Sequence, residues 1–190
     1  MLGDDELKLF LAKLPTAKMV DEARLALTFQ LLTAQRCGEV AALRWDEIDR
    51  GSGVWTIPKE KAKNGLAHRV PLSEPALAVL GQARVLNPAT VYVFPSPVRD
   101  GPMVETALSR ALHRNLEHIG VPAFGPHDLR RTAASHMTGM GISRLVVSKI
   151  LNHVERGVTA VYDRHSYDGE KRLALEAWGR RVVELAVAGA

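Results

Sequence analysis

Apolar residues recur at helical spacing along most of this chain. The segment DDELKLFLAKL opens with acidic residues, which favour a helix N-terminus, and carries a leucine stripe up to Pro15. Residues 19–35 are apolar on most sides and predict a buried central helix. Further helices are expected over residues 73–86, with Ser73 as the N-cap, and over residues 104–120, ending at Gly120.

The pattern changes between residues 54 and 72. The segments VWTIP and AHRVPL are rich in β-branched and aromatic residues, and they flank Asn64-Gly65, a strong signal for a hairpin turn. Pro58 lacks a backbone donor and predicts that the first strand is an edge strand. The segment VYVFPS is compatible with a strand or an extended connection. The expected fold class is therefore mainly α with a small antiparallel β-hairpin.

The C-terminal third is predicted to be helical with short breaks. The segments PHDLRRTAASHM, ISRLVVSKILNH and VTAVYDRHS each follow a glycine or begin at a proline. In residues 168–188 the charged residues fall on one face of a helix, and the other face carries Leu175, Trp178, Val182 and Leu185. Because no linker or repeat interrupts the chain, residues 1–190 are expected to form a single domain.

The composition limits the possible classes of function. Of 190 residues, 46% are hydrophobic and 24% charged, so a buried core is available and disorder is not expected. The net charge of +4 permits a polyanionic partner. The one cysteine, Cys37, cannot form an internal disulfide or a multi-cysteine zinc site. No apolar run approaches the ~18 residues of a membrane span, so a cytoplasmic protein is expected.

Six residues are candidates for chemistry, and each also has an ordinary structural explanation. His127 and Arg130 lie three positions apart and share a face of the predicted helix, where they offer a proton-transfer group beside a fixed cation. Such a pair alone is usually a solvated surface, and a lone histidine or tyrosine usually caps or packs a helix. The full set is Arg36, Lys63, His127, Arg130, His153 and Tyr162.

The two upstream candidates stand at turns. Arg36 ends an apolar helix and precedes Cys37-Gly38-Glu39, where Gly38 allows the backbone to turn and aim the guanidinium inward. Lys63 stands directly before the Asn-Gly turn. By contrast, Lys59 and Lys61 are expected to be solvated edge charges.

Together the candidates match what the metal-free cleavage of a phosphodiester requires. Two arginine forks can neutralise the nonbridging oxygens as charge develops in the transition state. A deprotonated tyrosine can attack in line, and Tyr162 is a candidate for this role with Tyr167 as its nearest rival. A lysine ammonium can protonate the departing 5′ oxygen.

A metal site is the alternative explanation for the histidines. His127-Asp128 is an HD dipeptide, and its possible companions are His113, His118, His136 and His153. However, no carboxylate triad and no HExxH pattern is present. We therefore expect neither a metal nor another cofactor.

These motifs resemble those of the tyrosine recombinases, or phage-type integrases, and are most similar to integrases of bacterial prophages and mobile elements. TAQRCGEVAALRWDEID resembles the first arginine motif, and KAKNGLAHRVPLS resembles the hairpin that carries the catalytic lysine. HDLRRTAASHM matches the HxxR box, KILNH matches the box of the third basic residue, and VTAVYDR matches the nucleophile segment. The chain departs from the family at Ala34 and Asn152, where glycine is common, and neither change removes a functional group.

The resemblance implies a role for each candidate. Tyr162 would attack the scissile phosphate to form a 3′-phosphotyrosyl link, while Arg36 and Arg130 clamp its nonbridging oxygens. His127 would assist proton transfer, His153 would hydrogen-bond the phosphate, and Lys63 would protonate the 5′ oxygen. The supporting residues implied around them are Glu39 and Asp128.

The resemblance also implies partners and domain organisation. The substrate would be double-stranded DNA carrying attachment sites, with a tetramer assembling on it and accessory DNA-bending or directionality proteins possible. Because full-length members usually carry N-terminal core-binding and arm-binding domains, residues 1–190 are expected to be the catalytic domain alone. A type IB topoisomerase-like enzyme, a non-catalytic DNA-binding module and an HD-type phosphohydrolase are the alternatives.

Overall fold

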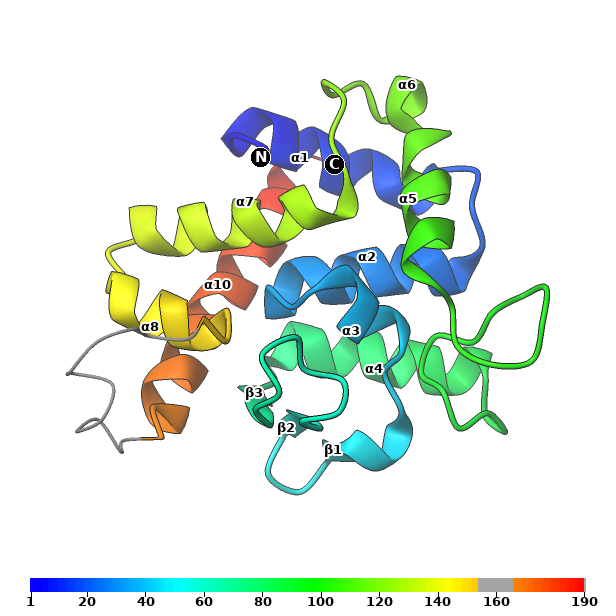
Figure 1. Cartoon of the computed structure of the whole chain (residues 1–190). Helices are drawn as coiled ribbons and strands as arrows, with labels where there is room; N and C mark the ends of the chain where they lie inside the picture. The colour runs from blue at the N-terminus through cyan, green and yellow to red at the C-terminus, as the bar shows by residue number, and fades with distance from the viewer. Residues whose placement is uncertain (154–165, 190) are drawn as a thin grey trace.

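The computed structural model describes residues 1–153 and 166–189, which form a group of packed helices with a small sheet at one edge (Figure 1). The helices, in chain order, are α1 (Asp4–Lys13), η1 (Leu14–Thr16), α2 (Asp21–Thr33), α3 (Cys37–Ala41), η2 (Trp45–Glu47), α4 (Glu74–Leu86), α5 (Glu105–His113), α6 (Leu116–Ile119), α7 (Pro126–Gly139), α8 (Arg144–Ile150) and α10 (Asp168–Ala188). The strands are β1 (Ile48–Asp49), β2 (Val54–Ile57) and β3 (His68–Pro71). The predicted fold class, mainly α with a small antiparallel sheet, is confirmed.

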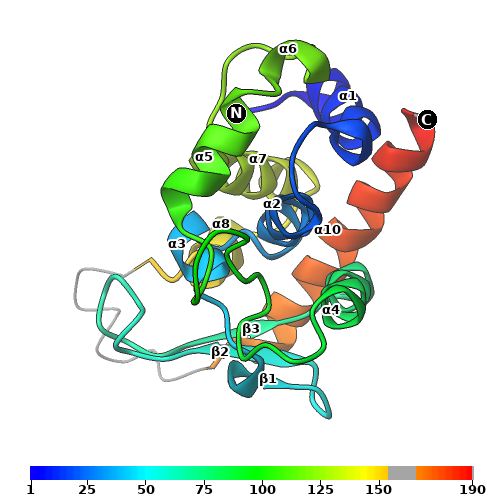
Figure 2. The ribbon, with the colours of Figure 1, turned by 90° about the vertical axis from the view of Figure 1, so that its right-hand side faces the viewer.

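Helix α2 lies at the centre of the domain, as its sequence predicts. Its apolar residues point to several sides, and both views place it among α3, α4, α7 and α10 (Figures 1 and 2). Phe29 packs against Trp55 of the sheet and against Phe94. On another side, the indole Nε1 of the fully buried Trp178 donates to the carbonyl of Leu31 at 2.8 Å. The C-terminal end of α2 is thereby fixed by neighbours from distant parts of the chain.

The sheet has one more strand than expected. Its order is β1-β2-β3, all antiparallel, with Trp55 paired to Ile48 on one side and to Val70 on the other. The prediction that Pro58 marks an edge strand is wrong, because β2 is the central strand. Pro58 comes one position after β2 ends, so its missing N–H is not needed by the ladder.

The connection between β2 and β3 is longer than a tight hairpin. The last pair of the ladder is Ile57 with His68, so residues 58–67 form a loop and Asn64-Gly65 lies within it. Gly65 has φ 70°, a left-handed conformation that suits glycine. The loop extends to one side of the domain (Figure 2). The Asn-Gly signal therefore located the turn region but not its length.

Two other predicted elements differ in detail. The expected helix over residues 104–120 is divided into α5 and α6 at Asn115. The Asn115 amide accepts from the N–H of Lys18 at 2.7 Å and donates to the carbonyl of Ala111 at 2.8 Å. Such side-chain hydrogen bonds to the backbone compete with a continuous helix. The VYVFPS segment forms an extended connection, hydrogen-bonded from the N–H of Val93 to the carbonyl of Leu43.

The C-terminal helix has the predicted division of faces. The four residues of the predicted apolar face are at most 4% exposed, namely Leu175, Trp178, Val182 and Leu185. On the opposite face, Arg180 and Glu184 are exposed. The predicted helix over residues 158–166 lies largely outside the described residues. Within the described part of the chain, no helix has the length and apolar character needed to cross a membrane.

Candidate active site

Five of the six candidate residues line one hollow, although they come from four separate segments. Arg36 follows α2, Lys63 lies in the β2–β3 loop, His127 and Arg130 lie on α7, and His153 follows α8. We call this space, of about 640 Å³, the polar hollow; its lining is completed by Asn64, Arg131, Ala134, Leu151 and Asn152. Two arginines, a lysine and two histidines therefore converge where the sequence motifs predicted a phosphate site.

Arg130 is the most buried of these cations, with 4% of its surface exposed. Its Nη1 donates to the carbonyl of Ala34 at 2.8 Å, and its Nη2 donates to the carbonyl of Leu151. Burial and the charge of Arg36 lower the pKa of Arg130 to about 10. Because that value is still far above neutral, the guanidinium remains a fixed cation whose plane is set by two backbone groups.

Arg36 is held by a buried carboxylate. It is the residue before α3, and Glu39 accepts from its backbone N–H at 3.1 Å and from its Nη1 at 2.9 Å. The Glu39 side chain is only 5% exposed, while Arg36 is partly exposed to the hollow. This double contact is the helix-start arrangement in which a residue three positions along caps the preceding N–H. Glu39 thus holds the backbone and the guanidinium of Arg36 in place.

Both departures from the family's usual glycine fall on left-handed backbone. Ala34 has φ 56° and Asn152 has φ 50°. The carbonyls that Arg130 binds belong to Ala34 itself and to Leu151, the residue before Asn152. The left-handed turns therefore direct these two chain segments toward Arg130. Glycine adopts this conformation without strain and asparagine tolerates it, whereas alanine is disfavoured there.

The two histidines of the hollow are both exposed and both have a lowered pKa. For His127 the causes are partial burial and then the charges of Arg131 and Arg130. For His153 they are partial burial and then the charges of Arg130 and Arg36. Both imidazoles are therefore biased toward the neutral form, which can accept a proton or a hydrogen bond.

Lys63 is exposed at the rim of the hollow, and its neighbours in the loop are anchored. The ammonium of Lys61 donates to the carbonyl of Ala42 at 2.8 Å and to the carboxylate of Glu47. The prediction that Lys61 is a solvated edge charge is wrong, because its partners in the α3–η2 region draw the side chain inward. Lys59, with 71% of its side chain exposed, is the solvated charge that was predicted.

The hollow also has a lining residue that was not among the predicted site residues. Arg131 follows Arg130 on α7 and contributes to the lining of the hollow. Its Nη1 donates to Asp128 at 3.2 Å. Asp128 also accepts from the N–H of Gly125 at 3.0 Å, so it caps α7. The hydrogen bond from Gly125 holds the pKa of this carboxyl below its usual range.

The candidate nucleophile Tyr162 lies outside the described residues. Its rival Tyr167 is described and does not line the polar hollow. Tyr167 precedes α10 with φ 55°, and the ammonium of Lys149 lies 4.7 Å from the centre of its ring.

Two of the histidines named as possible metal ligands have partners away from the polar hollow. His118 contacts the hydroxyl of Thr16 at 3.0 Å, and His136 contacts the carbonyl of Leu2 at 3.1 Å. Among residues 1–153 and 166–189, no group of three or more histidine, cysteine, aspartate or glutamate side chains is placed to hold a metal ion.

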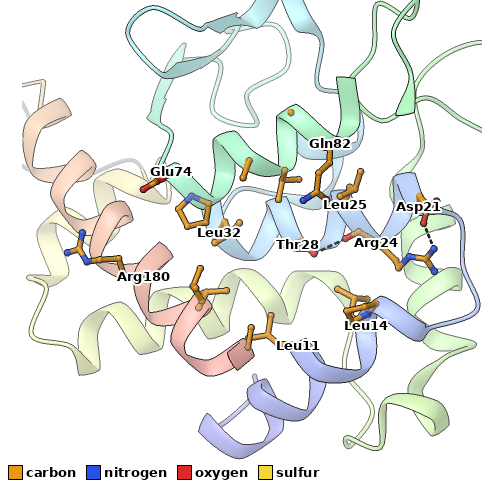
Figure 3. Close-up of a pocket in the computed structure, with 18 of the residues that line it drawn as sticks. Leu11, Leu14, Asp21, Arg24, Leu25, Thr28, Leu32, Glu74, Gln82 and Arg180 are labelled. Atoms are coloured by element: carbon orange, nitrogen blue, oxygen red, sulfur yellow. Dashed lines mark hydrogen bonds and ion pairs between the residues drawn. The ribbon is translucent and has the colours of Figure 1, made fainter. Parts of the chain in front are cut away.

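A larger groove of about 1390 Å³ lies between α1, α2, α4 and α10 (Figure 3). Leucines such as Leu11, Leu25 and Leu32 line it, with the Arg24–Asp21 ion pair at one edge. None of the five candidate residues that the structure describes contributes to its lining. These five residues therefore lie at the polar hollow and not at this groove.

Comparison with known proteins identifies the family. Residues 1–168 match the phage integrase family, and the chain belongs to it. The chain is 32% identical over 177 residues to the prophage integrase IntA of Escherichia coli, and the aligned region covers 92% of this chain and 42% of IntA. It is 26% identical over 167 residues to the tyrosine recombinase XerA of Pyrococcus furiosus, and the aligned region covers 86% of this chain and 56% of XerA. The chain thus spans about half the length of these relatives.

Solved structures share the fold. The integrase from mycobacterium phage Brujita superposes with a TM-score of 0.71 at 16% identity, over 94% of this chain and 61% of that one. The lambda integrase catalytic core superposes with a TM-score of 0.64 at 21% identity, over 83% of this chain and 93% of that one. Lambda integrase has also been solved as a tetramer bound to a Holliday junction, with a TM-score of 0.63 at 22% identity over 88% of this chain and 48% of that one.

Proposed function

We propose that this chain is the catalytic domain of a site-specific DNA recombinase that integrates or excises a mobile element. The observation that carries the proposal is the convergence of Arg36, Lys63, His127, Arg130 and His153 on one hollow. A phosphodiester in this hollow would meet two guanidinium groups and one ammonium, which is the charge complement that its transition state requires.

In the proposed reaction, the Tyr162 hydroxyl attacks the scissile phosphorus and a 3′-phosphotyrosyl bond forms as the bond to the 5′ oxygen breaks. His127, neutral because its pKa is lowered, assists removal of the tyrosine proton. Lys63 donates a proton to the departing 5′ oxygen. Attack by the 5′ hydroxyl of a second DNA strand then reverses these steps and reseals the backbone.

The remaining groups of the hollow have supporting roles. Arg36 and Arg130 contact the nonbridging oxygens, and their orientation is set before DNA binds, by Glu39 and by two backbone carbonyls respectively. Such preorganised donors stabilise a transition state without reorganising at the moment of reaction. His153 donates a hydrogen bond to the phosphate. No step requires a metal ion or another cofactor.

We further propose double-stranded DNA with attachment sites as the substrate, met in the bacterial cytoplasm, with four copies assembling on it. Residues 1–190 would be the catalytic domain of a longer recombinase whose core-binding and arm-binding domains are separate. Accessory DNA-bending or directionality proteins would set the direction of the reaction. The tetramer of lambda integrase on a Holliday junction is a precedent within this fold.

The test is strand exchange between two labelled duplexes that carry the element's own attachment sites, in the presence of excess EDTA. Recombinant duplexes are expected, and their formation should fall steeply with salt because phosphate contacts dominate DNA binding. Relaxation of supercoiled DNA without strand exchange would instead identify a topoisomerase-like enzyme. Loss of all cleavage in EDTA would identify a metal-dependent phosphohydrolase.

A further inference from the structure

The residue after Lys63 is tied to the residue before His153 by a pair of amide side chains. The Nδ2 of Asn64 donates to the Oδ1 of Asn152 at 2.9 Å and to the Asn152 carbonyl at 3.1 Å. In return, the Nδ2 of Asn152 donates to the Oδ1 of Asn64 at 3.3 Å. That same oxygen accepts from the backbone N–H of Leu66 at 3.1 Å. The Asn64 side chain therefore links two chain segments that are 88 positions apart.

Asn152 occupies a position that affects several groups of the polar hollow at once. Its left-handed conformation, φ 50°, turns the chain between Leu151 and His153. The Leu151 carbonyl accepts a hydrogen bond from Arg130, and His153 lines the hollow. The side chain of Asn152 reaches Asn64, and glycine at this position would have no such group.

Lys63 is thus flanked by anchors on both sides. On the N-terminal side, Lys61 is bonded to Ala42 and Glu47, and Ala62 is buried. On the C-terminal side, the anchor is the pair of Asn64 with Asn152. If that pair were lost, the loop would keep its contacts before Lys63 but would no longer be tied to the segment before His153.

We propose that Asn64 and Asn152 are positioning residues that hold Lys63 over the scissile phosphate, so that its ammonium meets the departing 5′ oxygen. The proposal rests on the proposed recombinase function. It assigns the amide at residue 152 a task that glycine, common in the family at this place, cannot perform. A displacement of about 1 Å in a catalytic group can reduce a rate by roughly 100-fold, so the anchoring of a loop lysine has kinetic consequences.

The experiment compares two leaving groups in otherwise identical nicked duplexes carrying the attachment site. One has the ordinary 5′ oxygen at the scissile bond, and the other has sulfur in its place. When the P–S bond breaks, the thiolate leaves without a proton, because a thiol is far more acidic than an alcohol. Cleavage of the sulfur substrate therefore does not depend on the proton that Lys63 supplies.

The variants are Asn64→Ala, Asn152→Gly, and the two combined. Asn152→Gly keeps the left-handed turn accessible while removing the amide. Lys63→Ala is the reference for complete loss of the acid. Glu60→Gln is the matched control, because Glu60 lies in the same loop with 68% of its side chain exposed.

With the oxygen substrate, each single variant should cleave about 10- to 100-fold more slowly than the original chain, and Glu60→Gln should be unchanged. With the sulfur substrate, all of them should cleave at close to the original rate, as should Lys63→Ala. The double variant should be no slower than the slower single variant, because the two side chains act as one unit.

Equal losses on the two substrates would overturn the proposal, because they would reveal a general structural role. Unchanged cleavage of the oxygen substrate by the single variants would overturn it too. If the original chain forms no covalent adduct with either substrate, the proposed function itself fails. Positioning can then still be judged without DNA, by hydrogen exchange of residues 59–67. Exchange should be faster in Asn152→Gly than in the original chain, and equal exchange would refute the anchoring.

Discussion

The guanidinium of Arg130 donates to the carbonyl oxygen of Ala34 at 2.8 Å, across 96 positions of sequence. Ala34 ends helix α2 in a left-handed conformation, and this turn presents its carbonyl toward α7. Arg130 therefore has two tasks, because a group proposed to bind phosphate also joins the central helix to its neighbour. The same side chain reaches the Leu151 carbonyl and so orders the segment before His153.

Replacing Arg130 should consequently damage both catalysis and stability. Arg130→Lys replaces the two separate donor nitrogens of the guanidinium, Nη1 and Nη2, by a single ammonium. One of the two carbonyls is then expected to lose its partner, and a buried acceptor left unpaired costs about 1–3 kcal/mol. We expect a loss of that size in the free energy of unfolding, measured by urea denaturation. The rate of covalent adduct formation should fall by roughly 100-fold or more.

Arg36→Lys is the matched control, because Arg36 is partly exposed and a lysine can still pair with Glu39. It should reduce the rate of adduct formation with a smaller change in unfolding free energy. If the two variants lost the same stability, the structural task assigned to Arg130 would be wrong.

Stability should depend on pH through His68. This residue is buried in β3, with Nε2 hydrogen-bonded to the carbonyl of Ile150 at 2.9 Å. Burial, followed by the charge of Lys171, lowers its pKa to about 4 from an ordinary value of about 6.5. Between these two pH values His68 is protonated in the unfolded chain and neutral in the folded chain. His68 therefore contributes roughly 3 kcal/mol to the free energy of unfolding above about pH 6.5, and this contribution is lost as the pH falls toward 4.

The variant that tests this dependence is His68→Gln, whose amide can still donate to Ile150 but does not titrate. Denaturant unfolding between pH 4 and pH 7 should give a shallower slope of unfolding free energy with pH in the variant. Asp128 and Asp168, whose pKa values are lowered, change the unfolding free energy at pH values below this range in both proteins. Identical slopes would show that His68 does not carry the effect.

The rate of adduct formation should fall on acidification, with its midpoint below the ordinary histidine pKa of about 6.5. The reason is that His127 must be neutral to accept a proton, and its pKa is lowered by burial and by Arg131. Arg131→Gln removes one repelling cation, so the pKa of His127 rises and the midpoint should move to higher pH. Single-turnover cleavage of a nicked duplex across a pH series measures this shift. A midpoint that stays in place or moves to lower pH would contradict the role of His127.

The sequence was sufficient to predict most helices and the convergence of five distant residues. The helices were visible because their apolar faces are buried, as in α10, where Trp178 packs beneath α2. The convergence of Arg36, Lys63, His127, Arg130 and His153 came from the family motifs, since each residue alone has an ordinary explanation.

What could not be predicted depends on contacts between distant segments. Asn115 breaks a helix because it meets the backbone of Lys18, and Lys61 turns inward because Ala42 and Glu47 are near. Likewise, the departure at Asn152 looked neutral in sequence, because its partner Asn64 becomes its neighbour only in the folded chain.

The most direct test of the central claim is to identify the residue that becomes joined to DNA. The protein is incubated with a nicked duplex that traps the covalent intermediate, the adduct is digested, and the peptide attached to the 3′ phosphate is sequenced by mass spectrometry. We expect attachment at Tyr162, with Tyr162→Phe binding DNA but forming no adduct and Tyr167→Phe still forming it. An adduct that persists in Tyr162→Phe and disappears in Tyr167→Phe would show that Tyr167, and not Tyr162, is the nucleophile.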